Sequence, residues 1–407
     1  MKKTEAIPTV DATKGAATMP GTNWRRLLGF QNISAIYIFI VGFIVFAAIP
    51  KSSAQFLSGG NWASVLDSNS LTVLAAVAVL IPLVAGVFNL AIGAEITWAV
   101  MICVVLQTPP AQGGGLALAL GLPWQLAAII TIACGALIGL VSGLVITKLK
   151  IDSFIATLGM SSILGALTYL VSANRPLTNL ADPSFHYVYS WGIPLGTFTL
   201  TLPIIVMIVI SFVVWYVLER TPVGRRSYAA GFNPDGARLS GVNVPALQLG
   251  SLVAGGVIAG IIGVLGASHV YGSPGFGTPM LLPALAAVFL GSTQFRGGRF
   301  NVWGTVLALY VLASLTQGFL DLGADRWISD LFYGVALIGA VALSVWDRGG
   351  KRTKAIRQAT ALTKEQKAKV AAENAAEPEL PPQLSPTRTA LEEDTIAGTD
   401  PDRRTED

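Results

Sequence analysis

Two polar side chains interrupt one of the most apolar stretches of the sequence, FNLAIGAE at residues 88–95. Glu95 is the one carboxylate well inside an apolar run. Buried acids in a membrane are costly and often functional, although an acid at the membrane interface can simply extend toward water. Asn89 and Gly93 tolerate unusual backbone angles and can break a helix. The pattern predicts that Asn89, Gly93 and Glu95 border the path of a substrate.

A second set of candidate residues lies in the longest polar stretch between apolar runs, residues 219–247. The sequence Thr221-Pro222-Val223-Gly224 predicts a turn, and Asn233-Pro234-Asp235 predicts the start of a short helix at about 234–240. A short helix flanked by basic side chains suits docking onto carboxylates of a partner, whereas a plain connector is the alternative. The residues predicted to form the docking element are Arg225, Arg226, Asn233, Pro234, Asp235, Arg238 and Gly241.

The sequence lacks the common motifs of enzymes and cofactor sites. It has no G-x-x-x-x-G-K-[ST] motif, which excludes ATP binding through a P-loop, and no nucleophile elbow or H-E-x-x-H. His186 and His269 have no cysteine or acid beside them that would complete a metal site. Cys103 and Cys134 lie in apolar stretches, where a thiol serves as a small hydrophobic side chain. We therefore expect no enzymatic activity, no metal and no cofactor.

The chain that must position these residues is mostly apolar. Of its 407 residues, 53% are hydrophobic and only 12% are charged, and the mean hydropathy is +0.62. A soluble domain has roughly 25% charged residues. The pI near 9.0 is no sign of a nucleic-acid partner, because Lys and Arg lie at the ends of apolar runs, where membrane topology explains them. The composition predicts an all-α polytopic membrane protein in contact with membrane lipid.

The apolar runs predict about ten transmembrane helices within a domain of residues 33–346. These helices are expected at about 33–49, twice within 71–108, and then at 124–147, 153–172, 198–218, 248–270, 279–293, 302–320 and 327–346. Two crossings within 71–108 leave little chain for a connection. The sequence therefore predicts either a tight turn at the inner face or a helix broken inside the membrane near 88–95. Irregular backbone in the bilayer is tolerated only where protein or a water-filled cavity satisfies it.

The basic residues predict which side of the membrane each loop faces. With a cytoplasmic N-terminus, the inside segments hold 24 of the 27 Lys and Arg residues, and Lys51, Arg175 and Arg326 are the three outside. Residues 1–32 are then a cytoplasmic N-terminal segment and residues 347–407 a cytoplasmic tail. The Pro, Glu, Asp and Thr content of the tail predicts that it is largely disordered.

Glycines recur at four-residue spacing in two of the predicted helices. Gly135, Gly139 and Gly143 share one helix, and Gly256 and Gly260 share another. Small residues at this spacing let two helices approach closely. The spacing therefore predicts tight helix packing, with a gate as the alternative interpretation.

Residues 219–244, ERTPVGRRSYAAGFNPDGARLSGVNV, closely resemble the cytoplasmic loop of the ribose-type permeases of bacterial ABC importers. Three apolar stretches resemble the same family, each less specifically: FNLAIGAE at 88–95, KIDSFIATLGMSSILGALTYLVSANRPL at 150–177, and LPALAAVFLGSTQFRGGRFNVWGTVLALYVLASLTQGF at 282–319. The four stretches occur in the family's order over most of 70–346. One departure is that the family usually has Asp-Leu-Ser-Val-Gly where this chain has Asn89-Leu90-Ala91-Ile92-Gly93.

The resemblance implies a membrane-spanning subunit of an importer in the bacterial inner membrane that moves a ribose-like monosaccharide by alternating access. The implied partners are cytoplasmic ATPase subunits, an extracytoplasmic substrate-binding protein and a second permease copy in a homodimer or heterodimer. The lost acid and serine at 89–93 leave a nucleoside, an autoinducer sugar or an amino acid open as the substrate. An ion-coupled secondary transporter is a further alternative, for which the sequence offers only Glu95 as a coupling acid.

Overall fold

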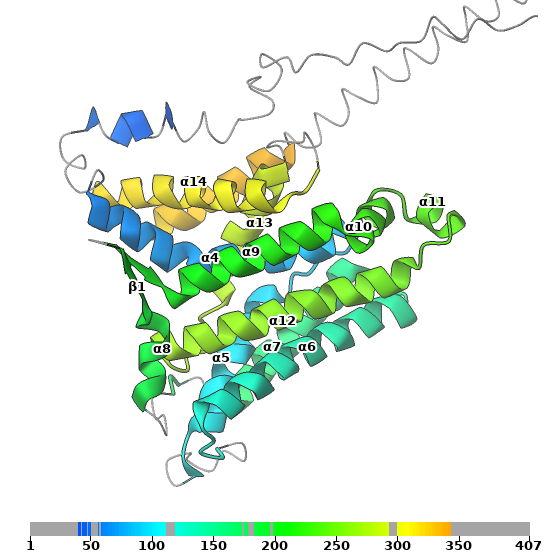
Figure 1. Cartoon of the computed structure of the whole chain (residues 1–407), viewed down its shortest axis with the longest axis horizontal. Coiled ribbons are helices and arrows are strands. Elements are labelled where there is room, and N and C mark those ends of the chain that lie inside the picture. Colours follow the sequence, from blue (N-terminus) through cyan, green and yellow to red (C-terminus); the bar gives the residue numbers. More distant parts are fainter. Residues whose placement is uncertain are drawn as a thin grey trace, which may run out of the picture. The chain divides into compact units, whose positions relative to one another are not determined.

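The structure is a computed structural model. It describes residues 40–342 apart from residues 42, 47, 50–55, 57, 111–118, 173–174, 178–182, 196–197 and 293–298. The described elements belong to one compact unit, Met1–Arg348 (Figure 1). The predicted N-terminal segment of 1–32 and the predicted tail of 347–407 lie outside the described residues.

Apolar helices make up most of the described chain. Six are long and apolar enough to cross a membrane: α4 (Gly59–Val84), α6 (Trp124–Lys148), α7 (Ser153–Ser172), α9 (Leu202–Arg220), α12 (Val244–Val270) and α14 (Val302–Asp321). Shorter ones are α5 (Ile92–Gln107), α13 (Leu281–Ser292), which follows the 3-10 turn η3 (Thr278–Met280), and Trp327–Ala342. The all-α polytopic class is thereby confirmed, and ten crossings remain a prediction.

Short elements lie at the two opposite ends of the long helices (Figure 1). One end carries η2 (Pro183–His186), α8 (Tyr187–Ser190) and an antiparallel hairpin of β1 (Gly192–Leu195) and β2 (Phe198–Thr201). The other end carries α10 (Pro222–Phe232) and α11 (Pro234–Leu239). The helix predicted at 198–218 begins only at Leu202, because the preceding residues pair in β2.

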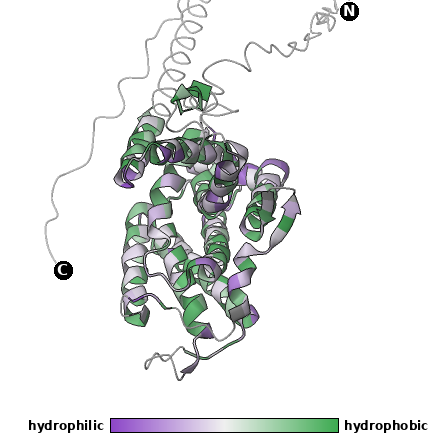
Figure 2. Cartoon of the chain, turned by 90° about the vertical axis from the view of Figure 1, so that its left-hand side faces the viewer, coloured by the Kyte–Doolittle hydropathy of each residue, from purple (hydrophilic) through white to green (hydrophobic). Residues whose placement is uncertain are grey.

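The core lies around α4 and α12. Residues 73–80 of α4 are all fully buried, and α12 packs against α6, α5 and α4. Other helices keep large apolar side chains exposed, for example Leu170 on α7 and Phe212 on α9. Seen toward the α8 end, hydrophobic residues lie on outward-facing as well as inward-facing parts of the helices (Figure 2). An apolar exterior of this kind matches a lipid surrounding.

The glycine spacing predicts the tightest of these helix contacts correctly. A Cβ atom at Gly135 would overlap the carbonyl oxygen of Gly256, and one at Gly139 would overlap that of Leu252. A Cβ atom at Gly260 would lie 2.7 Å from Ile132 Cα. The glycines therefore let the backbones of α6 and α12 touch, as small residues do between membrane helices.

Helix α4 begins at Gly59, twelve residues before the apolar run that starts at residue 71. The two helices α4 and α5 are therefore not confined to residues 71–108, as the sequence predicted. Ser58 caps the helix by accepting a hydrogen bond from Asn61 N (3.2 Å), and Asn61 Nδ2 donates to Asp321 (3.2 Å). Asp67 accepts hydrogen bonds from Thr201 and Tyr189. Contacts with other elements therefore support a polar first part of the helix, which hydropathy alone does not detect.

Candidate functional site

The helix break predicted near residues 88–95 is present between α4 and α5. Helix α4 ends at Val84, and the chain turns through Gly86, whose φ of +80° is a backbone conformation that favours glycine. Residues 87–91 are not helical. Side chains of α7 satisfy two of their amide groups, because Phe88 N donates to Ser153 Oγ (3.3 Å) and Leu90 N donates to Thr157 Oγ1 (3.2 Å).

The non-helical segment leads back into the bundle, and the depth of the break in the membrane stays a prediction. A Cβ atom at Gly255 of α12 would lie 3.1 Å from the carbonyl oxygen of Ala78 and 3.9 Å from Asn89 Nδ2. Asn89 therefore lies at the height of Ala78 along α4, before the point where that helix ends at Val84. A tight turn follows α4, and α5 then starts inside the bundle.

The Asn89 and Glu95 side chains meet each other in the interior, and each is only 1% exposed. Asn89 Nδ2 donates to both carboxylate oxygens of Glu95 (3.2 and 3.3 Å), and Asn89 Oδ1 accepts from Ala91 N (3.0 Å). Glu95 does not extend toward water. The pair ties the non-helical segment to the first turn of α5, and in this conformation neither side chain is open to a solute.

Sequence reasoning did not foresee a second break, which lies between α12 and α13. Helix α12 ends at Val270, Tyr271 has a φ of +57°, and η3 precedes α13. Gly277 N donates to Thr97 Oγ1 of α5 (3.0 Å), and a Cβ atom at Gly93 would lie 3.0 Å from Gly277 O. The starts of α5 and η3 are therefore in backbone contact. Two features of the sequence could have indicated this second break. They are the Gly- and Pro-rich stretch YGSPGFGTP and the shortness of the helix predicted at 279–293.

Both breaks reach the surface of the described chain. Phe88 is 40% exposed, and Thr278 and Pro279 are also exposed. Irregular backbone at membrane depth is stable only against protein or a water-filled cavity. At membrane depth, the exposed backbone at Thr278 and Pro279 would therefore need protein or water as its neighbour.

The polar stretch 219–247 forms two helices rather than a turn and one helix. Thr221 is the N-cap of α10, where it accepts a hydrogen bond from Gly224 N (3.4 Å), and Pro222 occupies the first helical position. The predicted turn at 221–224 was wrong, because the same residue types also start a helix when apolar and small residues continue the pattern. Ser227 and Ala230 are the buried side of α10.

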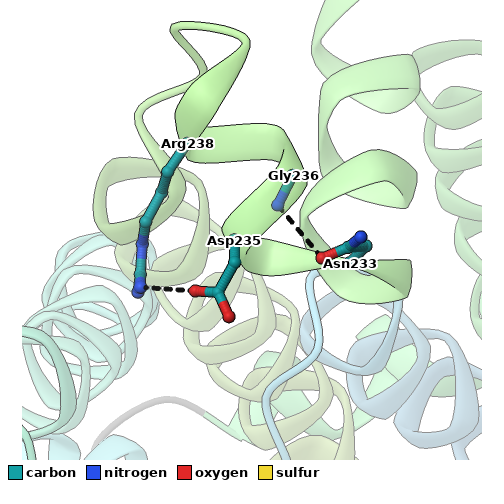
Figure 3. Close-up of polar contacts among 4 residues, drawn as sticks. All are labelled: Asn233, Asp235, Gly236 and Arg238. Atoms are coloured by element: carbon teal, nitrogen blue, oxygen red, sulfur yellow. Dashed lines mark hydrogen bonds and ion pairs between the residues drawn. The ribbon is translucent and has the colours of Figure 1, made fainter. Parts of the chain in front are cut away.

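The predicted short helix is confirmed as α11. Asn233 Oδ1 accepts a hydrogen bond from Gly236 N (3.0 Å; Figure 3). Pro234 begins the helix. Gly241 has a φ of +79°, in the left-handed region that commonly ends a helix. Local capping chemistry therefore fixes both ends of a six-residue helix.

The three arginines predicted to form the docking element, Arg225, Arg226 and Arg238, are exposed, as docking requires. Arg238 Nη1 lies 3.3 Å from Asp235 Oδ1 on the same helix (Figure 3), and their side chains are 56% and 85% exposed. Exposed ion pairs contribute only roughly 0.2–1 kcal/mol. Arg238 can therefore leave Asp235 and pair with a carboxylate of a partner at little cost in free energy.

The most exposed large apolar side chains of the described residues also lie here, and sequence reasoning overlooked them. Phe232 is 94% exposed at the end of α10, and Leu239 is 92% exposed at the end of α11. Large apolar side chains that stand in water often mark an interface with another protein. The signal was available, since both are bulky apolar residues at the ends of short polar helices.

Broken helices that meet inside an apolar bundle, together with an exposed helical loop at one end, define a multi-pass membrane protein of the transport type. A family model described as "Branched-chain amino acid transport system / permease component" matches residues 61–341. The chain belongs to this family of permeases, in agreement with the resemblance seen in its sequence.

Several curated relatives are import permeases for monosaccharides. The chain is 28% identical to the ribose import permease of Escherichia coli K12 over 308 residues, which cover 73% of this chain and 89% of that protein. It is 28% identical to the galactose/methyl galactoside import permease of the same strain over 80% of this chain and 97% of that protein. A fructose import permease of Rhizobium meliloti is 30% identical over 56% of this chain and 64% of its own length. No solved structure matches the chain significantly.

Proposed function

We propose that this chain is the membrane-spanning permease subunit of an ATP-binding cassette importer and that its substrate is a small monosaccharide. The observation that carries the proposal is the similarity to ribose and galactose import permeases along most of the chain. ATP hydrolysis belongs to separate subunits, since the sequence has no P-loop. The transport cycle is alternating access.

The α10–α11 region is the docking element for the ATPase. Its exposed Phe232 and Leu239 would enter apolar pockets of the partner, while Arg225, Arg226 and Arg238 would pair with carboxylates around them. Asn233, Pro234, Asp235 and Gly241 shape α11, the helix that presents these side chains. This proposal makes the α10–α11 end cytoplasmic.

The remaining partners follow from the same proposal. An extracytoplasmic substrate-binding protein would meet the α8 end, and both termini would be cytoplasmic, as the basic residues predict. The permease domain would extend over 33–346. A second permease copy would cover the face with Thr278 and Pro279, where lipid is unfavourable.

The translocation path runs along that face, beside the two breaks. Gly93 borders the path at its contact with Gly277. Asn89 and Glu95 hold the start of α5, and with it Gly93, in place through their hydrogen bonds. A break whose backbone groups can be redirected suits a site that must open to one side and then the other.

Uptake into right-side-out vesicles that hold the full importer tests the proposal. We expect ATP-dependent uptake of one of D-ribose, D-galactose or D-fructose, unaffected by collapse of the ion gradient. Uptake that survives ATP depletion but stops when the gradient collapses would instead establish a secondary transporter. ATP-driven uptake of leucine without uptake of any of these sugars would overturn the sugar assignment.

A further inference from the structure

The two broken helices are α4–α5 and α12–α13, and helix α10 contacts the first through α4 and the second through α12. It also contacts α11. At its C-terminal end, a Cβ atom at Gly231 would overlap the carbonyl oxygen of Val84 and lie 2.9 Å from Gly86 N. A Cβ atom at Gly86 would likewise lie 3.0 Å from Gly231 Cα. The last turn of α10 therefore rests directly on the backbone where α4 ends and the first break begins.

One turn earlier, Tyr228 joins α10 to the chain between α13 and α14. Tyr228 Oη donates a hydrogen bond to Phe300 O (2.6 Å), and the guanidinium carbon of Arg299 lies 3.7 Å from the centre of the Tyr228 ring. This distance is well within the range of a cation–π interaction.

The residues that Tyr228 holds are fixed in turn to α13. The Phe300 ring packs edge-on against Phe289 of α13, with 5.8 Å between ring centres. Asn301 Nδ2 donates to Gly291 O near the end of α13 (3.0 Å). A displacement of Tyr228 is therefore carried to the second broken helix.

Helices α10 and α11 share a single residue as their joint. Asn233 is the C-cap of α10 and the N-cap of α11, and its backbone N–H donates to Ala229 O (3.0 Å). Ala230 of α10 and Ala237 of α11 pack together with Val244 in one buried cluster. A push on α11 therefore moves α10 with it.

We propose that α10 relays movement from the docking helix α11 to both broken helices, with Gly231 as its contact to the α4–α5 break and Tyr228 as its contact to α13. This inference rests on the proposed importer function. Tyr228 and Gly231 are positioning residues, because each acts through the neighbouring chain segments that it contacts. Their loss should separate ATP hydrolysis from uptake rather than abolish either binding event.

The test uses the complete importer in proteoliposomes and measures sugar taken up per ATP hydrolysed. Tyr228→Leu should lower this ratio about tenfold, the effect expected from losing a buried hydrogen bond and a cation–π contact together. Tyr228→Phe keeps the ring under Arg299 and should lower it less. Tyr216→Leu, at an exposed tyrosine of α9, is the matched control and should leave the ratio unchanged.

The outcomes separate the relay from the importer function itself. A wild-type importer without ATP-driven uptake would overturn the proposed function. A coupled wild type together with an unchanged ratio in Tyr228→Leu would overturn the relay alone. Arg299→Gln supplies a second route to the same contact if Tyr228→Leu fails to assemble, and an unchanged ratio there would count equally against the relay.

Discussion

The α4–α5 break and the α10–α11 loop use similar residues in opposite surroundings. Both contain an asparagine, a glycine and an acid within a few positions. In the break, Asn89 and Glu95 are buried against each other. In the loop, Asn233 and Asp235 are exposed, and their side chains bond only within α11. The same helix-breaking chemistry thus builds a packed interior junction in one region and an exposed short helix, the proposed docking element, in the other.

The contrast determines how each region should respond to substitution. Space is the limiting quantity in the break, because Gly93 touches the backbone of Gly277 and Thr278. Surface chemistry is the limiting quantity in the loop, because the side chains of Phe232, Arg238 and Leu239 are exposed. Added volume should therefore damage the break, whereas altered polarity should damage the loop.

The largest effect is expected from Gly93→Leu. A Cβ atom at this position already lies 3.0 Å from Gly277 O and 3.3 Å from Thr278 Cα, so a leucine must push the two broken helices apart. Uptake should fall by at least about tenfold, since overpacking typically costs 1–3 kcal/mol. Sugar uptake in cells, normalised to the amount of assembled protein in the membrane, measures it.

A glycine with open surroundings supplies the control for this substitution. A Cβ atom at Gly159 of α7 would meet nothing within 4 Å, so Gly159→Leu should leave uptake close to that of the wild type. Normal uptake by Gly93→Leu would show that the break does not border the translocation path and that it tolerates added volume.

The double substitution Phe232→Ser and Leu239→Ser should give the next largest effect. Both side chains are almost fully exposed, so the isolated permease loses no packing and should stay folded. Affinity for the ATPase should fall by about tenfold or more if the two side chains are buried in the complex, since truncation of a buried interface anchor often costs 2 kcal/mol or more. Co-purification of the ATPase subunit with the tagged permease, quantified against wild type, is the measurement.

An exposed apolar pair elsewhere on the chain tests the specificity of this result. Val209→Ser with Val213→Ser changes an apolar surface on the span α9, away from the loop, where the two side chains are 54% and 52% exposed. That variant should retain the ATPase. Equal loss of the ATPase from both variants would show that general folding, and not docking, is being measured.

Arg238→Glu should have a smaller effect that depends on salt. The substitution replaces the pair with Asp235 by two like charges three residues apart and reverses the charge offered to a partner. Substrate-stimulated ATP hydrolysis should fall several-fold at low ionic strength and recover partly at high salt, because exposed charges are screened. Arg238→Gln, without the reversal, should lie between this variant and wild type. Hydrolysis unchanged at every salt concentration would reduce Arg238 to a solvated surface residue.

Local chemistry explains why much of both regions could be predicted from the sequence. The caps of α11 at Asn233 and Gly241 depend on neighbouring residues alone, and so does the tendency of Asn89 and Gly93 to interrupt a helix. The glycine spacing of α6 and α12 predicts their close packing because helix periodicity fixes which residues share a face.

What the sequence could not provide depends on distant parts of the chain. The contact of Gly93 with Gly277 joins segments more than 180 residues apart, and no local pattern marks it. The polar start of α4 is stabilised by Asp321, Thr201 and Tyr189, so hydropathy places that helix too late. The exposure of Phe232 and Leu239 likewise follows from tertiary packing, because a large apolar residue is more often buried than exposed.

Asn233→Ala should give the smallest effect, and it tests whether the loop acts through the shape of α11 rather than through the Asn233 side chain itself. Loss of an N-cap costs roughly 1 kcal/mol, and a six-residue helix has few other bonds to compensate. ATP-driven uptake should therefore fall by no more than about fivefold.

Asn243→Ala is the matched control, since Asn243 caps α12 in the same way by accepting a hydrogen bond from Ala246 N (3.1 Å). Helix α12, however, is 27 residues long and is held by tertiary packing. Uptake reduced by Asn233→Ala but not by Asn243→Ala would locate the sensitivity in the docking helix. Equal effects would mean that capping at this end of the molecule matters only for stability, and full coupling in both variants would leave the loop a connector.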